Sequence, residues 1–283
     1  MSHPNPASHS RIAAFLQTER LEKNLFRGTS RDLGTPQVYG GQVLAQAIDA
    51  AQQTVEDRDL HSAHAHFLRR GDHHDSIIYE VERSRNGGSI SSRRVVAIQQ
   101  GRPIFTMSAS FQAPQAGFEF QRDLHLPPPP QEDAAAMDDW AAIRRAASGI
   151  FGEQFSLSPV ATDHPPGLLQ FWIKANRSPG PQPQCHQAVL AYISDFGLLS
   201  AALAAQGLGH RPPDSLMVAT IDHGLWLHRP CQVDSWLLYR CRALSNSGGR
   251  GLATGAIYDQ HGTRIASSMQ EGVIRPRRPI KPP

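Results

Sequence analysis

The stretch HAHFLRR, residues 64–70, decides the fold, because a related stretch, HGLWLHR, occupies residues 223–229. At an offset of 159 positions their first and last residues match, and a Gly-Gly pair follows each stretch, at 87–88 and at 248–249. Self-similarity at a long period marks a chain built from repeated units, and a Gly-Gly pair between apolar runs is typical of a turn. The sequence therefore predicts that one structural unit occurs twice.

Each copy carries an apolar segment upstream of this stretch, GQVLAQAI at residues 41–48 and HQAVLAYI at residues 186–193. Both are apolar almost all round, which indicates a buried helix rather than an amphipathic one. Along residues 105–112, FTMSASFQ, apolar and polar residues alternate as in a strand with one solvated face. We therefore expect an α+β protein in which each repeat wraps an antiparallel sheet around a helix.

The repeats set the expected domain limits. We predict an N-terminal repeat at residues 1–115, flexible at its start, and a C-terminal repeat carrying the active site at 171–276. A proline-rich connector at 116–170 joins them, with a short helix around 137–147. A basic, proline-rich tail at 277–283 ends the chain.

Composition excludes several classes of protein. The net charge is +3 over 283 residues, and the basic residues are spread along the chain, so nucleic-acid binding is not expected. Three cysteines without a CxxC pair, and the lack of a signal peptide, favour the cytoplasm. Residues 185–209 are apolar enough to suggest a membrane span. They contain Asp195 and lack flanking anchors, so we expect a buried helix and no membrane insertion.

Six blocks resemble the acyl-CoA thioesterase II family in order, between about Leu21 and Arg275: LFRGTSRDLGTPQVYGGQVLAQA, HAHFLRRGD, RRVVAIQQGRPIFTMSASFQAPQAGFE, AYISDFGLL, VATIDHGLWLHRP and SSMQEGVIR. The resemblance implies a double-hotdog fold, with two helix-wrapped repeats in one chain. It also implies hydrolysis of fatty acyl-CoA to free fatty acid and coenzyme A without a metal or other cofactor. Hotdog sheets tend to associate, so a homo-oligomer, dimer or tetramer, is expected.

The resemblance assigns the catalytic roles to Asp195, Thr220 and Gln270. The residues themselves agree with a site. Asp195 is the one formally charged residue in an apolar helix, and a buried carboxylate is costly unless it is hydrogen-bonded or functional. Gln270 lies on a strand face that is apolar in the first repeat, whereas Thr220 is an ordinary strand residue by itself. Together they can orient a water molecule for attack on a thioester.

The duplication separates function from folding at these three positions. Gln42 aligned with Gln187 places Ala50 opposite Asp195. The offset of 159 places His61 opposite Thr220, and two residues inserted further along the chain place Ala109 opposite Gln270. If the polar trio were needed to build the unit, the first repeat would need it as well. We therefore expect one active site per chain, in the second repeat.

Two other functions fit the same fold. A non-catalytic acyl-CoA binding protein would be expected to lack the trio. An enoyl-CoA hydratase of this fold resembles its relatives in carrying His five residues after the helix Asp, where this chain has Ser200. No G-x-S-x-G motif indicates a serine hydrolase. The histidines at positions 61, 64, 66, 73 and 74 match no zinc spacing. The sequence identifies neither the residues that bind the coenzyme A phosphates nor the preferred acyl chain.

Overall fold

The computed structural model describes residues 11–35, 37–122, 126–130, 147–160, 165–209 and 212–277. The strands are β1 Glu19–Glu22, β2 Leu25–Gly28, β3 Asp59–Phe67, β4 Ile77–Asn86, β5 Ile90–Gln99, β6 Arg102–Gln112, β7 Phe155–Pro159, β8 Leu168–Ala175, β9 Leu216–Leu227, β10 Leu237–Ser247, β11 Arg250–Asp259 and β12 Arg264–Pro276. The helices are α1 Arg11–Leu16, α2 Gly40–Gln52, α4 Pro183–Ser194 and α5 Leu198–Ala204. Residues 147–151 are also helical and lead into a 3-10 turn, η3, at Gly152–Gln154.

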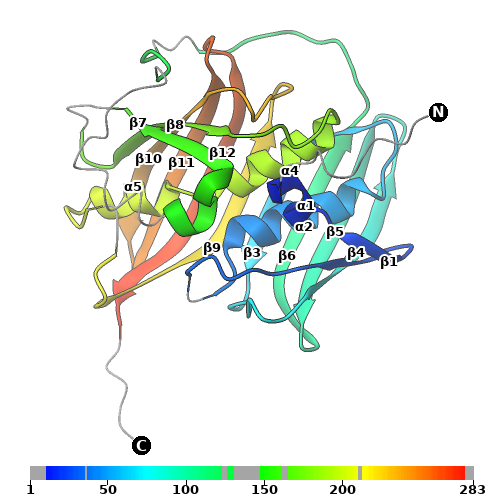
Figure 1. Cartoon of the computed structure of the whole chain (residues 1–283), viewed down its shortest axis with the longest axis horizontal. Helices are drawn as coiled ribbons and strands as arrows, with labels where there is room; N and C mark the ends of the chain where they lie inside the picture. Colours follow the sequence, from blue (N-terminus) through cyan, green and yellow to red (C-terminus); the bar gives the residue numbers. More distant parts are fainter. Residues whose placement is uncertain are drawn as a thin grey trace, which may run out of the picture.

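The strands form one 12-stranded antiparallel sheet in the order β1-β2-β4-β5-β6-β3-β9-β12-β11-β10-β8-β7. The order of the second six strands mirrors that of the first six, so each repeat contributes an equivalent half. The halves join where β3 pairs with β9. Helices α2 and α4 lie next to each other on one face of the sheet (Figure 1). This arrangement confirms the duplication and is a double hotdog.

Strand pairing corrects the alignment of the repeats by one residue. β3 ends at Phe67 and β9 at Leu227, 160 positions apart. The next backbone N–H groups, of Leu68 and His228, donate to equivalent carbonyls. The predicted offset of 159 was wrong here because it was chosen to match identical His and Arg residues, without regard to the face of the sheet on which each side chain lies. A slip of one residue turns every side chain of a strand to the other face.

The corrected register changes two counterparts. At the offset of 160, buried His223 matches buried Ala63 rather than His64, which is exposed. Thr220 then matches Leu60, so His61 is not its counterpart. Both positions are apolar in the first repeat. The expectation that the first repeat lacks the polar trio is therefore unchanged.

The two long helices are core helices, as predicted. The neighbouring α4 and α5 form the one stretch among the described residues, Pro183–Ala204, whose length and composition would suit a membrane span. Its most apolar window is 72% buried within the structure. Apolar contacts with the sheet and with α2 account for that composition, as in the core helix of a globular protein.

The sheet of the second repeat begins earlier than the sequence indicated. β7 and the first residues of β8 lie within 116–170, the range assigned to the connector. The helix predicted around 137–147 falls outside the described residues except at its last position, and the tail at 277–283 does so beyond Arg277. The domain limits themselves stay a prediction.

Candidate active site

Asp195 lies at the junction of the two repeats. It is the C-cap residue of α4, and it accepts hydrogen bonds from the backbone N–H of Gly41 and from the Gln270 side chain. Gly41 belongs to the first turn of α2, so the carboxylate from the second repeat meets a helix N-terminus of the first. Unpaired N–H groups and the helix dipole favour a negative charge there.

Burial dominates the electrostatics of this carboxyl group. It raises the pKa of Asp195 to about 7, while the hydrogen bonds from Gly41 and Gln270 act in the opposite direction. Asp195 Oδ1 is buried but accepts a hydrogen bond from no described residue. A carboxylate that titrates near neutral pH, with a free acceptor oxygen, suits a general base.

Gln270 connects the carboxylate to the strands. Its side chain extends from β12, is 1% exposed, and donates through Nε2 to Thr220 Oγ1 on β9 over 2.8 Å. The structure therefore brings Asp195, Thr220 and Gln270 together, although they lie on three different elements. Thr220 faces a cavity, which gives the cluster access to a bound molecule.

His223 and Ser194 complete this network, and sequence reasoning missed both. His223 Nδ1 lies 2.9 Å from Gln270 Oε1, and its Nε2 lies 2.9 Å from Ser194 Oγ. Burial lowers the pKa of His223 to about 4, so the ring is neutral at neutral pH. Because Gln270 offers its oxygen to the ring, the proton belongs on Nδ1, and Ser194 then donates to Nε2. The other possible acceptor for the Ser194 hydroxyl is the Ala191 carbonyl oxygen, at 2.8 Å.

Gly40 and Gly41 allow the helix end to approach the carboxylate. A Cβ atom on Gly40 would lie 2.7 Å from Asp195 Oδ2, and one on Gly41 would collide with the Tyr192 carbonyl oxygen. The Gly-Gly pair at the start of the segment GGQVLAQA was the signal that could have located this contact. Its partner Asp195 lies in the other repeat, so the sequence alone did not reveal it.

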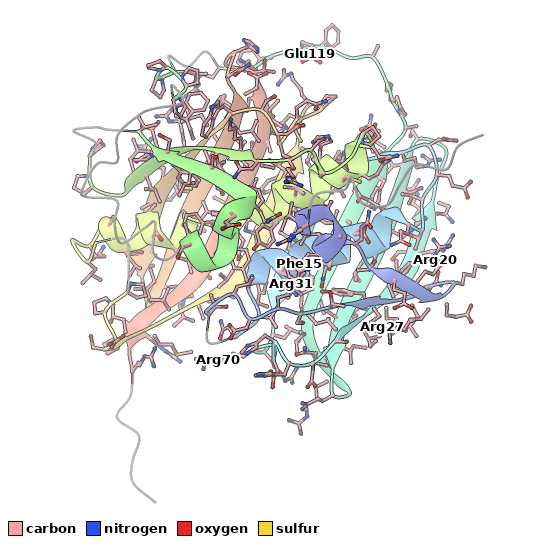
Figure 2. The ribbon with its side chains drawn as sticks, in the orientation of Figure 1. Phe15, Arg20, Arg27, Arg31, Arg70 and Glu119 are labelled. Atoms are coloured by element: carbon pink, nitrogen blue, oxygen red, sulfur yellow. The ribbon has the colours of Figure 1, made fainter. Side chains whose placement is uncertain are left out.

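A cavity of about 300 Å³ opens beside Thr220 and Gly40. Apolar side chains from both repeats, among them Val43 and Phe67, share its walls with polar groups. Arg69 and Arg70 also line it. Both are exposed, and Arg70 lies at the molecular surface (Figure 2). An apolar space with cations at its rim can hold an apolar chain attached to an anionic group.

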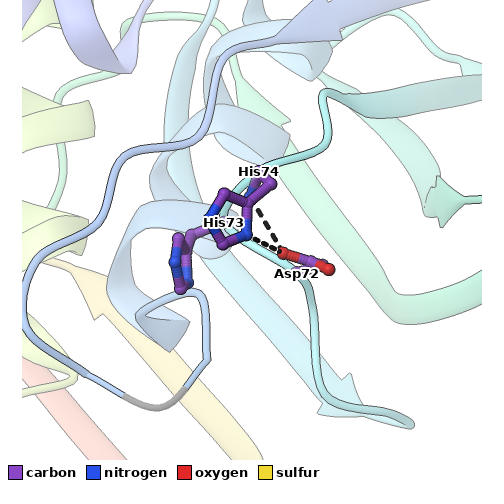
Figure 3. A group of neighbouring side chains, drawn as sticks. All are labelled: Asp72, His73 and His74. Atoms are coloured by element: carbon purple, nitrogen blue, oxygen red, sulfur yellow. Dashed lines mark hydrogen bonds and ion pairs between the residues drawn. The ribbon is translucent and has the colours of Figure 1, made fainter.

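The histidine-rich segment lies outside this cluster. Asp72, His73 and His74 have ligand atoms close enough to share a metal ion (Figure 3). The Asp72 carboxylate instead accepts hydrogen bonds from the His74 backbone N–H and ring, both at 2.9 Å. The His73 and His74 rings pack against each other at a tilt of 39°, with centroids 4.2 Å apart. This segment therefore carries no argument for a metal.

The equivalent part of the first repeat has no comparable cluster. The structural counterparts of Thr220, His223 and Gln270 are Leu60, Ala63 and Ala109, and all three are buried and apolar. For Asp195, the helix alignment gives Ala50, also buried. The polar network thus belongs to the second repeat, with the α2 N-terminus as the contribution of the first.

A double-hotdog sheet with a carboxylate at the repeat junction, beside a cavity lined by apolar side chains and arginines, defines a hotdog-fold protein with a candidate hydrolytic site. Family comparison agrees: residues 29–112 match the acyl-CoA thioesterase N-terminal domain, and residues 122–274 match the C-terminal domain. The chain belongs to the acyl-CoA thioesterase II family.

Individual relatives match nearly the whole chain. Acyl-CoA thioesterase 2 of Haemophilus influenzae is 38% identical, covering 92% of this chain and 95% of its own. Human acyl-coenzyme A thioesterase 8 is 34% identical, covering 93% and 88%. The crystal structure of the acyl-CoA thioesterase II TesB2 from Mycobacterium marinum has 36% identity and a TM-score of 0.80, covering 94% of this chain and 98% of that one.

Proposed function

We propose that this acyl-CoA thioester hydrolase converts fatty acyl-CoA to free fatty acid and coenzyme A with a water molecule held by Asp195, Thr220 and Gln270. The observation that carries the proposal is the buried Asp195 carboxylate, whose Oδ1 has no partner among the described residues. The names of the bacterial and human relatives support the substrate class.

The proposed reaction is a general-base hydrolysis. Asp195 accepts a proton from the water as its oxygen attacks the thioester carbonyl carbon. The C–S bond then breaks and the electron pair leaves with sulfur. A thiol pKa of about 8.5 makes the thiolate a good leaving group, so it needs little protonation in the transition state. The proton taken up by Asp195 returns to solvent or to the thiolate, which restores the base.

The neighbouring side chains determine how the water is oriented. The Gln270 amide donates to the Asp195 carboxylate and to Thr220 Oγ1, which leaves the threonine hydroxyl proton free to point toward the water. His223 holds the Gln270 oxygen away from the carboxylate. We therefore assign Thr220 and Gln270 to the water and His223, with Ser194, to the positioning of Gln270.

Substrate binding follows from the cavity. The apolar side chains in the cavity wall suit the acyl or pantetheine chain, and the thioester carbonyl would lie next to the water site. Arg69 and Arg70 at the rim suit the phosphates of coenzyme A, since a guanidinium forms paired hydrogen bonds with phosphate oxygens.

We further propose that the protein acts in cytoplasmic fatty acid metabolism as a homo-oligomer, a dimer or tetramer. The absence of a CxxC pair and the presence of free cysteines support a reducing compartment. Light scattering after size-exclusion chromatography tests the oligomeric state, and a monomer at micromolar concentration would contradict it.

The test of function is the release of free thiol from saturated acyl-CoA, followed with a thiol-reactive dye. Asp195→Asn should lower kcat by about 10²-fold or more, as expected for loss of a general base. Asp259→Asn, which changes a carboxylate in the distant β11–β12 turn, is the matched control and should keep its activity. Binding of acyl-CoA without thiol release would instead support an acyl-CoA binding protein. Activity that chelator removes and zinc restores would contradict the proposed mechanism.

A further inference from the structure

The two repeats differ in the connection that follows the long helix. In the second repeat, residues 195–215 join α4 to β9 and include α5, which packs on β10, β11 and β12. In the first repeat, residues 53–58 alone join α2 to β3, and no helix corresponds to α5. In the second repeat α5 covers part of the sheet surface, and no helix of the described residues covers the equivalent surface of the first repeat.

Equivalent residues identify the same place in both repeats. Asn246 Nδ2 donates to the Ala202 carbonyl of α5 over 2.7 Å, and a Cβ atom on Gly251 would lie 3.0 Å from Ala202 Cβ. Their counterparts 160 positions earlier, Asn86 and Ser91, line a hollow of about 460 Å³. The hollow in the first repeat thus occupies the position of α5 in the second.

The floor of this hollow is a buried arginine without a counter-ion. Arg93 is 2% exposed and donates to neutral acceptors, among them Thr54 Oγ1 at 2.7 Å and Asn86 Oδ1 at 2.7 Å. No carboxylate of the described residues lies within ion-pair distance of it. Burial, with the charges of Arg83 and Arg58, lowers the pKa of Arg93. Three guanidinium groups therefore share the hollow without a matching anion on its floor.

Arg58 has unused hydrogen-bonding capacity. Its Nη2 donates to the carbonyls of Gly87 and Gly88, at 2.8 and 3.0 Å, whereas its Nη1 is buried without a partner among the described residues. Two carboxylates, of Glu56 and Asp57, also line the hollow. Both residues are exposed, and neither forms an ion pair with an arginine of the described chain. An unsatisfied buried donor on a cation is costly, and a bound anion would satisfy it.

We propose that this arginine hollow, lined by Arg58, Arg83 and Arg93, is a second binding site that takes an organic phosphate of nucleotide size. Arginine is the side chain best suited to phosphate oxygens, because its planar fork donates two parallel hydrogen bonds. The volume falls within the range of small-molecule sites, about 300–1,000 Å³. The site lies at the C-terminal end of α2, whereas the catalytic carboxylate lies at its N-terminal end. It is therefore separate from the proposed active site.

Calorimetric titration of the full-length protein at low salt tests the site, with adenosine 5′-diphosphate, inorganic pyrophosphate and adenosine as probes. The diphosphate and pyrophosphate should bind and adenosine should not, because the arginines recognise the charged group. Arg58→Gln and Arg83→Gln should each weaken diphosphate binding by about tenfold or more, the expected loss for a charge-assisted hydrogen bond. Arg94→Gln is the matched control, since this exposed arginine neighbours Arg93 on β5 but faces away from the hollow.

One further variant separates the hollow from the catalytic cavity. Arg70→Gln, at the rim of the catalytic cavity, should leave diphosphate binding at the hollow intact. Arg83 is exposed, so Arg83→Gln tests the site even if Arg58→Gln perturbs the β4–β5 turn. Thioesterase activity equal to the parent confirms folding of both hollow variants. The proposal fails if the parent binds neither phosphate probe at millimolar concentration, if Arg94→Gln weakens binding as much as Arg83→Gln, or if only Arg70→Gln abolishes it.

Discussion

Replacing Gln270 with alanine should raise the midpoint of the rise of kcat/KM with pH. In the parent, the pKa of Asp195 is about 7, so kcat/KM should rise with pH and level off above that value. Gln270 donates a hydrogen bond to the carboxylate and thereby favours its ionised form. Removing the amide removes that support, so the midpoint should move upward.

The size of the change follows from the hydrogen bond that is lost. A hydrogen bond to a charged group contributes about 1.5–3 kcal/mol, and one pKa unit corresponds to about 1.4 kcal/mol, so the midpoint should rise by about one to two units. At pH 7 the ionised fraction would fall from about a half to about a tenth or less. The lost contact with the water lowers the plateau rate as well, so part of the defect should remain at high pH.

The assay is thiol release from one acyl-CoA substrate between pH 5.5 and 9.5, with circular dichroism to confirm the fold. Gln260→Ala, which removes an exposed amide from the β11–β12 turn, serves as the control and should follow the parent profile. A Gln270→Ala profile with an unchanged or lower midpoint would show that the amide does not stabilise the carboxylate. The proposed water site would then be wrong.

Three other perturbations test separate parts of the site. Asp195→Asn should stabilise the protein while it lowers kcat. Burial raises the pKa of this group from 3.8 to about 7, so its ionisation destabilises the fold as pH rises through that range. The gain in unfolding free energy should reach up to about 4 kcal/mol at pH 8 and vanish near pH 4. Denaturant titration at both pH values measures it, and an equal gain at the two values would contradict the raised pKa. Gly40→Ala should reduce kcat by about 10²-fold with little loss of helix, because the added Cβ would lie 2.7 Å from Asp195 Oδ2 and displace the carboxylate. A normal kcat in a folded variant would contradict this close approach. Arg70→Gln should raise KM for acyl-CoA by about tenfold without altering hydrolysis of a short thioester that lacks phosphates, and an equal effect on both substrates would exclude a role in phosphate binding.

The sequence was sufficient to reveal the repeats and, through the family resemblance, to propose Asp195, Thr220 and Gln270 as the polar trio. Apolar periodicity depends on local chemistry, so the core helices and the alternation along β6 could be predicted from residue types alone. Asp195 was conspicuous because a charge in an apolar helix has a large desolvation cost. The comparison of two repeats within one chain then indicated which polar residues the fold itself does not require.

Tertiary structure decided how these residues meet. The contact of Asp195 with Gly41 joins two repeats, and the pairing of His223 with Gln270 depends on which face of β9 and β12 each side chain occupies. Matching residue types between the repeats cannot detect an error of one residue in a strand. That error matched His223 with the exposed His64, whereas the correct register matches it with the buried Ala63. The arginine hollow likewise depends on a helix that one repeat has and the other lacks. Such features arise from packing between distant segments, and local sequence patterns carry no direct record of that packing.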